Sequence, residues 1–159
     1  MCGQKMNAFF QDSRNRCSLL DAAASWQGTP WMAYGAARGL GVSSRMLVRM
    51  LYQEAGWNPI GIQWDSGLRA ARGWEPIAEW LRKCPWFGPA ERIEPGDLLV
   101  RFGSGAQFGV AIPDPARLSE SHCFVQCVQP TGVTATKLGD SEFMSGLKMV
   151  LRPLSEPRS

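Results

Sequence analysis

The sequence predicts an α+β fold, with helices in the first half of the chain and a roughly five-stranded, mainly antiparallel sheet in the second. The chain has 159 residues, of which 45% are hydrophobic and 19% are charged, as in a single globular domain. Apolar residues recur at helical spacing in the first half and alternate in short runs after Gly96. Helices followed by strands are typical of an α+β protein whose helices pack on the sheet.

The helical half contains one pattern that stands out. Residues 1–17 are expected to be a polar lead-in, and 18–26 (SLLDAAASW) a short helix. After a glycine-rich stretch, the segment SSRMLVRMLYQEAG predicts the central helix, which Ser43 or Ser44 can cap and Gly56 ends. Its apolar residues form one stripe, which predicts that this helix packs against the sheet.

Residues 57–88 form a tryptophan-rich insertion that carries five of the seven tryptophans. Apolar residues at helical spacing there predict a short helix that begins near Pro76. Most of these rings are expected to be core, although indole rings also bind sugars and protein partners. The predicted domain spans 18–153, and 154–159 form a tail. The expected strands are 98–102, 108–112, 123–129, 133–137 and 148–152.

Composition and charge exclude several classes of function. The net charge of +3 does not require nucleic acid as a partner, and no window of eighteen apolar residues predicts a membrane span. The N-terminus lacks the apolar core of a signal peptide, so we expect the chain to be cytoplasmic as synthesised. Five scattered cysteines without paired C-x2-C spacing are typical of reduced thiols, and we expect no metal and no cofactor.

Five segments in order carry a family resemblance. They are SWQGTPW, GLGVSSRMLVRMLYQEAGW, IEPGDLLVRF, AQFGVAI and CFVQCV. From about residue 18 to 153 the chain resembles the NlpC/P60 family of papain-like cysteine peptidases, which trim the peptide stems of bacterial cell walls. The resemblance implies a papain-like fold. It also implies an Asp-Cys pair at the start of the central helix, a histidine base on a strand, and a polar residue on the next strand that orients the histidine.

The resemblance places these roles on residues that cannot perform the chemistry. The Asp-Cys pair falls on Ser43 and Ser44, the base on Gln107 and the orienting residue on Gln126. A serine hydroxyl needs a partner that accepts its proton, and a glutamine amide does not accept protons near pH 7. We therefore expect no catalytic residues. His122, the single histidine, is separated from Gln126 by about 13 Å along a strand, far beyond the roughly 3 Å that a general base requires.

Three functional hypotheses follow. The first is a non-catalytic NlpC-like pseudoenzyme that serves as a structural or interaction module in a phage-tail-like or cell-wall-associated assembly, and so becomes part of a particle. The second is a binder of peptide or peptidoglycan fragments in the former cleft, and the third is a weak hydrolase that uses Ser44. Ser44 can equally be a helix cap, and the two glutamines can hydrogen-bond each other or the backbone inside a closed former cleft. The candidate binding residues are Tyr34, Ser43, Ser44, Arg45, Gln107 and Gln126.

Overall fold

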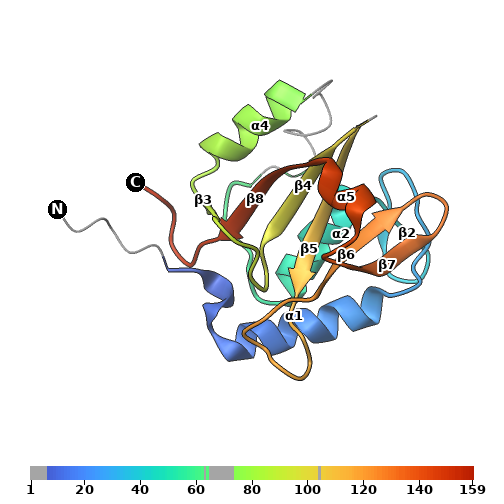
Figure 1. Cartoon of the computed structure of the whole chain (residues 1–159), viewed down its shortest axis with the longest axis horizontal. Coiled ribbons are helices and arrows are strands. Elements are labelled where there is room, and N and C mark those ends of the chain that lie inside the picture. Colours follow the sequence, from blue (N-terminus) through green and yellow to red (C-terminus); the bar gives the residue numbers. More distant parts are fainter. Residues whose placement is uncertain (1–6, 63, 65–73, 104) are drawn as a thin grey trace.

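The computed structural model describes residues 7–62, 64, 74–103 and 105–159. Its main feature is a six-stranded antiparallel sheet with the strand order β3-β8-β4-β5-β6-β7 (Figure 1). The helical elements are η1 (Phe9–Gln11), α1 (Ser13–Trp26), α2 (Ser44–Glu54), α4 (Trp74–Lys83) and α5 (Ser141–Ser145). The strands of the main sheet are β3 (Phe87–Pro89), β4 (Leu98–Phe102), β5 (Ala106–Ile112), β6 (Cys123–Val128), β7 (Gly132–Lys137) and β8 (Leu147–Pro153). A small hairpin consists of β1 (Ala36–Ala37) and β2 (Gly41–Val42).

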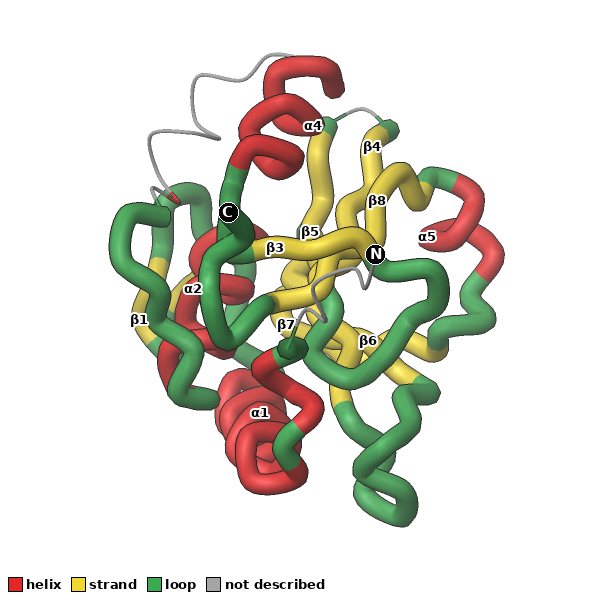
Figure 2. Tube along the Cα trace, turned by 90° about the vertical axis from the view of Figure 1, so that its left-hand side faces the viewer, coloured by secondary structure: helices red, strands yellow, loops and turns green. Residues whose placement is uncertain are grey.

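The sheet separates two hydrophobic clusters. Helices α1 and α2 lie on one side of the sheet and α5 lies on the other (Figure 2). Leu47 and Leu51 of α2 are fully buried with Val100 of β4 on the first side, whereas Leu99 packs on the second side with Phe143 of α5. Because successive side chains of a strand point to opposite faces of the sheet, neighbouring residues pack in different clusters.

The α+β class is confirmed, and the elements differ from expectation mainly in extent. Helix α1 begins at Ser13 rather than at 18, because the Asp12 carboxylate accepts a hydrogen bond from the Arg14 N–H at 2.8 Å and caps it. Helix α4 begins at Trp74, which puts Pro76 in its first turn as expected. The sheet has six strands rather than about five, because the three-residue β3 pairs with β8.

The tryptophan-rich segment contributes mostly to the core where it is described. Trp57 is 3% exposed, and its ring lies 4.9 Å from Tyr52 and 5.2 Å from Phe87, measured between ring centroids. Its indole N–H donates to the Leu154 carbonyl at 2.9 Å. The core interpretation of these rings is therefore supported for Trp57, while residues 65–73 of the predicted insertion lie outside the described residues.

A buried ion pair ties two central strands together. Asp97, at the start of β4, is fully buried and accepts hydrogen bonds at 3.0 Å from both Nε and Nη2 of Arg152 on β8. The preceding Gly96 has a φ of 91°, and its carbonyl accepts a hydrogen bond from the Tyr52 hydroxyl at 2.9 Å. The Pro-Gly-Asp turn thus connects the sheet with α2.

No helix in the described ranges is long and apolar enough to cross a membrane.

Candidate functional site

A tight loop precedes helix α2 and holds its first residues in place. The Ser43 N–H donates to the Gly35 carbonyl at 3.1 Å, and the Val42 N–H donates to the Pro30 carbonyl at 3.0 Å. The Ser43 hydroxyl accepts a hydrogen bond from the Met46 N–H at 3.3 Å, so Ser43 rather than Ser44 caps the helix. Ser44 is the first helical residue and is half-buried.

Two apolar groups face α2 from the neighbouring strands. Phe108 on β5 is 2% exposed and Cys127 on β6 is 3% exposed, and both belong to the cluster that α2 joins. The Cys127 thiol donates to the Val42 carbonyl at 3.2 Å, two residues before Ser44. Burial raises the pKa of the Cys127 thiol to about 11, so this thiol is neutral at pH 7 and is not a proton acceptor.

The two glutamines lie on the opposite face of the sheet from Ser44. The Gln107 carbonyl accepts a hydrogen bond from Nη1 of Arg101 at 2.9 Å, and the Arg101 guanidinium lies 6.0 Å from the ring centroid of Phe143 in α5. Gln126 has the same parity on β6 as Phe124, which packs against Phe143. Gln107 and Gln126 therefore face α5, and the expectation that they share a cleft with Ser44 needs correction.

Each glutamine is hydrogen-bonded, but to another side chain rather than to the second glutamine or to the backbone, as the structural interpretation had it. Gln126 is 8% exposed, and its amide nitrogen donates to the Thr136 hydroxyl at 3.0 Å. The residue opposite Gln126 on β5 is Gly109, not Gln107, and the two glutamines have different hydrogen-bond partners. The sequence motif predicted that Gln107 lies on this strand. A shift of one residue along a strand moves a side chain to the other face of the sheet, and the motif did not determine that face.

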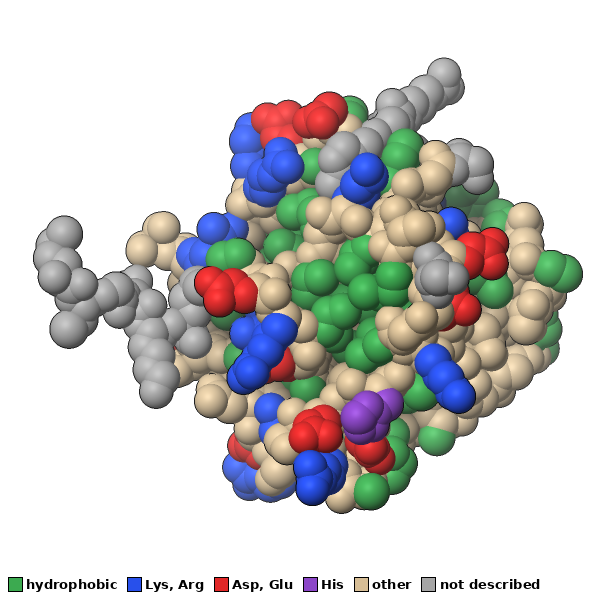
Figure 3. All heavy atoms as spheres, in the orientation of Figure 1, with side chains coloured by type: hydrophobic (Ala, Val, Ile, Leu, Met, Phe, Trp, Pro, Cys, Tyr) green, Lys and Arg blue, Asp and Glu red, His purple; other side chains and the backbone are tan. Residues whose placement is uncertain are grey.

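His122 is held by an acidic loop. Its Nε2 lies 3.1 Å from Oδ2 of Asp114 and 3.6 Å from Oε2 of Glu120, and its side chain is 65% exposed. Figure 3 shows this histidine in the lower part of the face in view, beside acidic side chains. Its ring is thus directed to carboxylates just before β6, which is not the arrangement that a Ser44 hydrolase requires. Among the described residues, no group of three or more potential metal ligands is found.

Tyr34 belongs to an exposed apolar loop that precedes α2. It is 67% exposed and has a φ of 61°, in the left-handed region that non-glycine residues rarely adopt. Trp31, Met32 and Leu40 in the same loop are 36%, 50% and 73% exposed. These three residues were not predicted from the sequence, although the low charge of the segment 28–44, in which Arg38 is the single charged side chain, was a usable signal.

The apolar loop, residues 31–40, is anchored to the helical side of the molecule. Arg38 forms an ion pair with Glu54 at the end of α2, and the indole N–H of Trp26 donates to the same carboxylate at 2.7 Å. The Arg38 guanidinium also lies 5.1 Å from the Trp26 ring centroid. Beside the loop, Arg45 is half-buried, and its Nη1 atom is buried without a hydrogen-bond partner in the part of the chain that the structure describes.

Comparisons with known proteins identify the fold. No protein-family model matches the chain, and no curated protein sequence matches it. Among solved structures, the chain is similar to an NLP/P60-family protein from Staphylococcus aureus that is described as similar to a lipoprotein, with a TM-score of 0.64 and 15% identity. The match covers 98% of this chain and 46% of that chain. The protein therefore has an NlpC/P60-like α+β fold and spans about half the length of that neighbour.

Proposed function

We propose that this protein is a non-hydrolytic NlpC-like pseudoenzyme that acts as an interaction module. The observation that carries the proposal is the environment of Ser44. The side chains described on the sheet face toward α2 are apolar, among them Phe108 and Val110, and the Cys127 thiol on that face is neutral, so none of them can accept a serine proton. A hydroxyl without such a partner is a poor nucleophile at neutral pH.

The apolar loop supports an interaction role. Its four exposed large side chains lie together in sequence immediately before α2, and its one charged side chain is already paired with Glu54. Aromatic and methionine side chains without surrounding charge are the composition that protein interfaces favour. In this proposal the apolar loop, which includes Tyr34, contacts a protein of a phage-tail-like or cell-wall-associated assembly. Ser43, Ser44 and Arg45 follow the loop and lie at the edge of the contact. The chain joins the assembly after synthesis in the cytoplasm.

A second candidate function is the binding of peptide or peptidoglycan fragments at the start of α2. The half-buried Arg45 guanidinium, with its unpartnered Nη1, favours it, because a peptide carboxylate or carbonyl would satisfy that nitrogen. A third candidate is weak hydrolysis by Ser44. It requires a proton acceptor other than the side chains that face α2 from the sheet.

One experiment separates the three functions. The protein is incubated with purified peptidoglycan stem peptides, and product release and binding are measured by mass spectrometry and calorimetry. We expect no product from the natural chain or from Ser44→Ala, with Ser25→Ala on α1 as a matched serine control. Product release that Ser44→Ala abolishes and Ser25→Ala retains would overturn the pseudoenzyme proposal. Saturable binding that Arg45→Gln weakens would favour the second function over the first.

A further inference from the structure

The side of the sheet that carries α5 is only partly covered. Helices α1 and α2 on the other side have 14 and 11 residues, whereas α5 has five. A helix of that length extends over about 7.5 Å, and the residues of β8 alone extend over about 23 Å. Helix α5 therefore covers one part of this side and leaves the rest of it without a described helix.

The partly covered side is apolar. Leu99, Phe124 and Phe143 form its buried centre, with the centroids of the two phenylalanine rings 4.1 Å apart. Figure 3 views the molecule from the α5 side and shows a continuous area of hydrophobic side chains in the middle of this face. Half-buried apolar side chains around the buried centre form what we call the α5-side patch: Ile93, Leu138, Met144, Leu147 and Val150.

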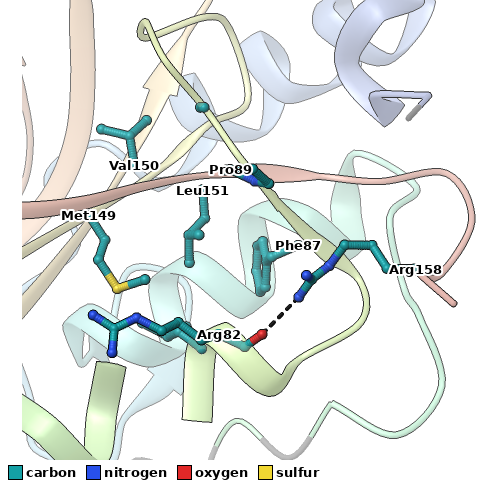
Figure 4. Close-up of a pocket in the computed structure, with 9 residues that line it drawn as sticks. Arg82, Phe87, Pro89, Met149, Val150, Leu151 and Arg158 are labelled. Carbon is teal, nitrogen blue, oxygen red and sulfur yellow. Dashed lines mark hydrogen bonds between the residues drawn. The ribbon is translucent and has the colours of Figure 1, made fainter. Parts of the chain in front are cut away.

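Strand β8 shows how the patch arises. The side chains of Met149 and Leu151 pack in the cluster that contains α2, and the Val150 side chain points to the opposite side of the strand (Figure 4). Leu151 is 7% exposed, whereas Val150 is only half-buried, although β8 lies between β3 and β4 in the sheet. A sheet face that meets only water usually carries polar side chains, so an apolar face is typical of an interface.

The α5-side patch has two different ends. Strands β4 and β8 are antiparallel, with Leu98 opposite Leu151, so the segment just before β4, which contains Ile93, lies at the end of β8 (Figure 1). Helix α5 lies at the other end of the patch, because it directly precedes β8. One end thus carries a helix above the sheet, and the Ile93 end is open. A second copy turned end for end would place its own α5 on the open end.

Exposed charges make such a second copy complementary. Glu91 and Arg92 lie beside Ile93 at the open end, whereas Glu142 and Lys148 lie at the α5 end. Neither Glu91 nor Lys148 forms an ion pair within the part of the chain that the structure describes. In an end-for-end pair, Glu91 of each copy lies near Lys148 of the other copy, and symmetry forms this contact twice.

We propose that two copies of this chain associate through the α5-side patch as a symmetric dimer, in which the α5 of each copy covers the open end of the other. The contact has an apolar centre and a charged rim, which is the usual composition of a homodimer interface. Each end carries both signs of charge, which favours a second copy over a partner of uniform charge. The contact lies across the sheet from α2, and the inference does not rest on the proposed function.

Sedimentation of the full chain over a range of concentrations tests the dimer. We expect a reversible equilibrium between monomer and dimer. Ile93→Glu introduces a charge into the patch and should weaken dimerisation at least about tenfold. Ile60→Glu is the matched control, because Ile60 is 93% exposed and lies outside the patch, and it should leave the equilibrium unchanged. A chain that remains monomeric at about 1 mM, or equal weakening by the two variants, would overturn the inference.

Charge reversal tests the end-for-end arrangement at residues whose exposure makes misfolding of the variants a minor concern. Glu91→Lys and Lys148→Glu each convert two attractions into repulsions, so each should weaken dimerisation about five- to tenfold. The double variant restores the attraction and should return the affinity to within about twofold of the natural chain. Glu156→Lys, at an exposed glutamate of the tail, is the control without effect. A double variant that dimerises more weakly than either single variant would contradict the proposal.

Discussion

At the scale of single residues, Gly96 occupies a position that has no room for a side chain. A Cβ at this position would lie 2.2 Å from the Phe10 ring, and the φ of 91° disfavours any residue with a Cβ. We expect Gly96→Ala to lower the free energy of unfolding by about 2–5 kcal/mol, from backbone strain and overpacking together. Urea denaturation measures this effect. Gly139→Ala, where a Cβ meets nothing within 4 Å, is the control and should change stability by less than about 1 kcal/mol.

A second prediction at this scale concerns the buried thiols. Burial raises the pKa of Cys127 to about 11 and also raises the pKa of Cys84, so folding favours their neutral forms. A group with a raised folded pKa contributes stability that is present below its ordinary pKa of 9.0 and is lost as the pH rises through the folded value. We therefore expect the free energy of unfolding to fall between pH 9 and pH 11. The fall should be smaller in Cys127→Ala and unchanged in Cys17→Ala, because Cys17 is exposed.

At the scale of elements, two adjacent serines at the start of α2 have different roles, because only Ser43 caps the helix. The Ser43 hydroxyl accepts from the Met46 N–H, whereas Ser44 is already helical. Ser43→Ala should cost about 1 kcal/mol in the free energy of unfolding, and Ser44→Ala no more than about half of that. Paired chemical denaturation curves of the two variants measure the difference. An equal or larger loss in Ser44→Ala would mean that the cap is assigned to the wrong residue.

A larger loss of stability is expected when the ion pair between β4 and β8 is broken. Asp97 is fully buried, and Arg152 is bound to it through two nitrogens. Asp97→Asn leaves the Arg152 guanidinium partly buried without its main counterion, so we expect a loss of about 2–4 kcal/mol. Asp12→Asn, which breaks the exposed ion pair with Arg14 but keeps a side chain that can cap α1, is the matched control and should cost no more than about 1 kcal/mol. Similar losses in the two variants would show that burial does not determine the effect.

The elements also show how far the sequence alone predicts the fold. The short apolar run after Gly96 predicted β4 with its bounds, because Leu98, Val100 and Phe102 pack in one cluster and Leu99 packs in the other. It did not predict β3, a three-residue strand that ends in proline and exists only because β8 lies beside it. Strand pairing between distant segments is a tertiary effect, and no local pattern encodes it.

At the scale of the whole molecule, the candidate site depends on a relation between helix and sheet that the sequence left ambiguous. The family resemblance placed Gln107 opposite Ser44, because it matched motifs along the chain. In the structure Gln107 faces α5 and Arg101, while Phe108 occupies the face toward α2. A shift of one residue along a strand exchanges the two faces, so only the packed structure decides which side chain meets the helix.

This placement leads to a last prediction about the double variant Ser44→Cys with Gln107→His. A thiol at a helix N-terminus becomes reactive when an imidazolium lies beside it. Because Gln107 lies on the α5 face of the sheet, a histidine there cannot contact a thiol at the start of α2 on the other face. We expect the pKa of the new thiol, measured from the pH dependence of alkylation with peptide-resolved mass spectrometry, to agree within about 0.3 between Ser44→Cys alone and the double variant. A thiol pKa lowered by one or more in the double variant alone would place residue 107 at the start of α2 and would restore the arrangement that the family resemblance implies.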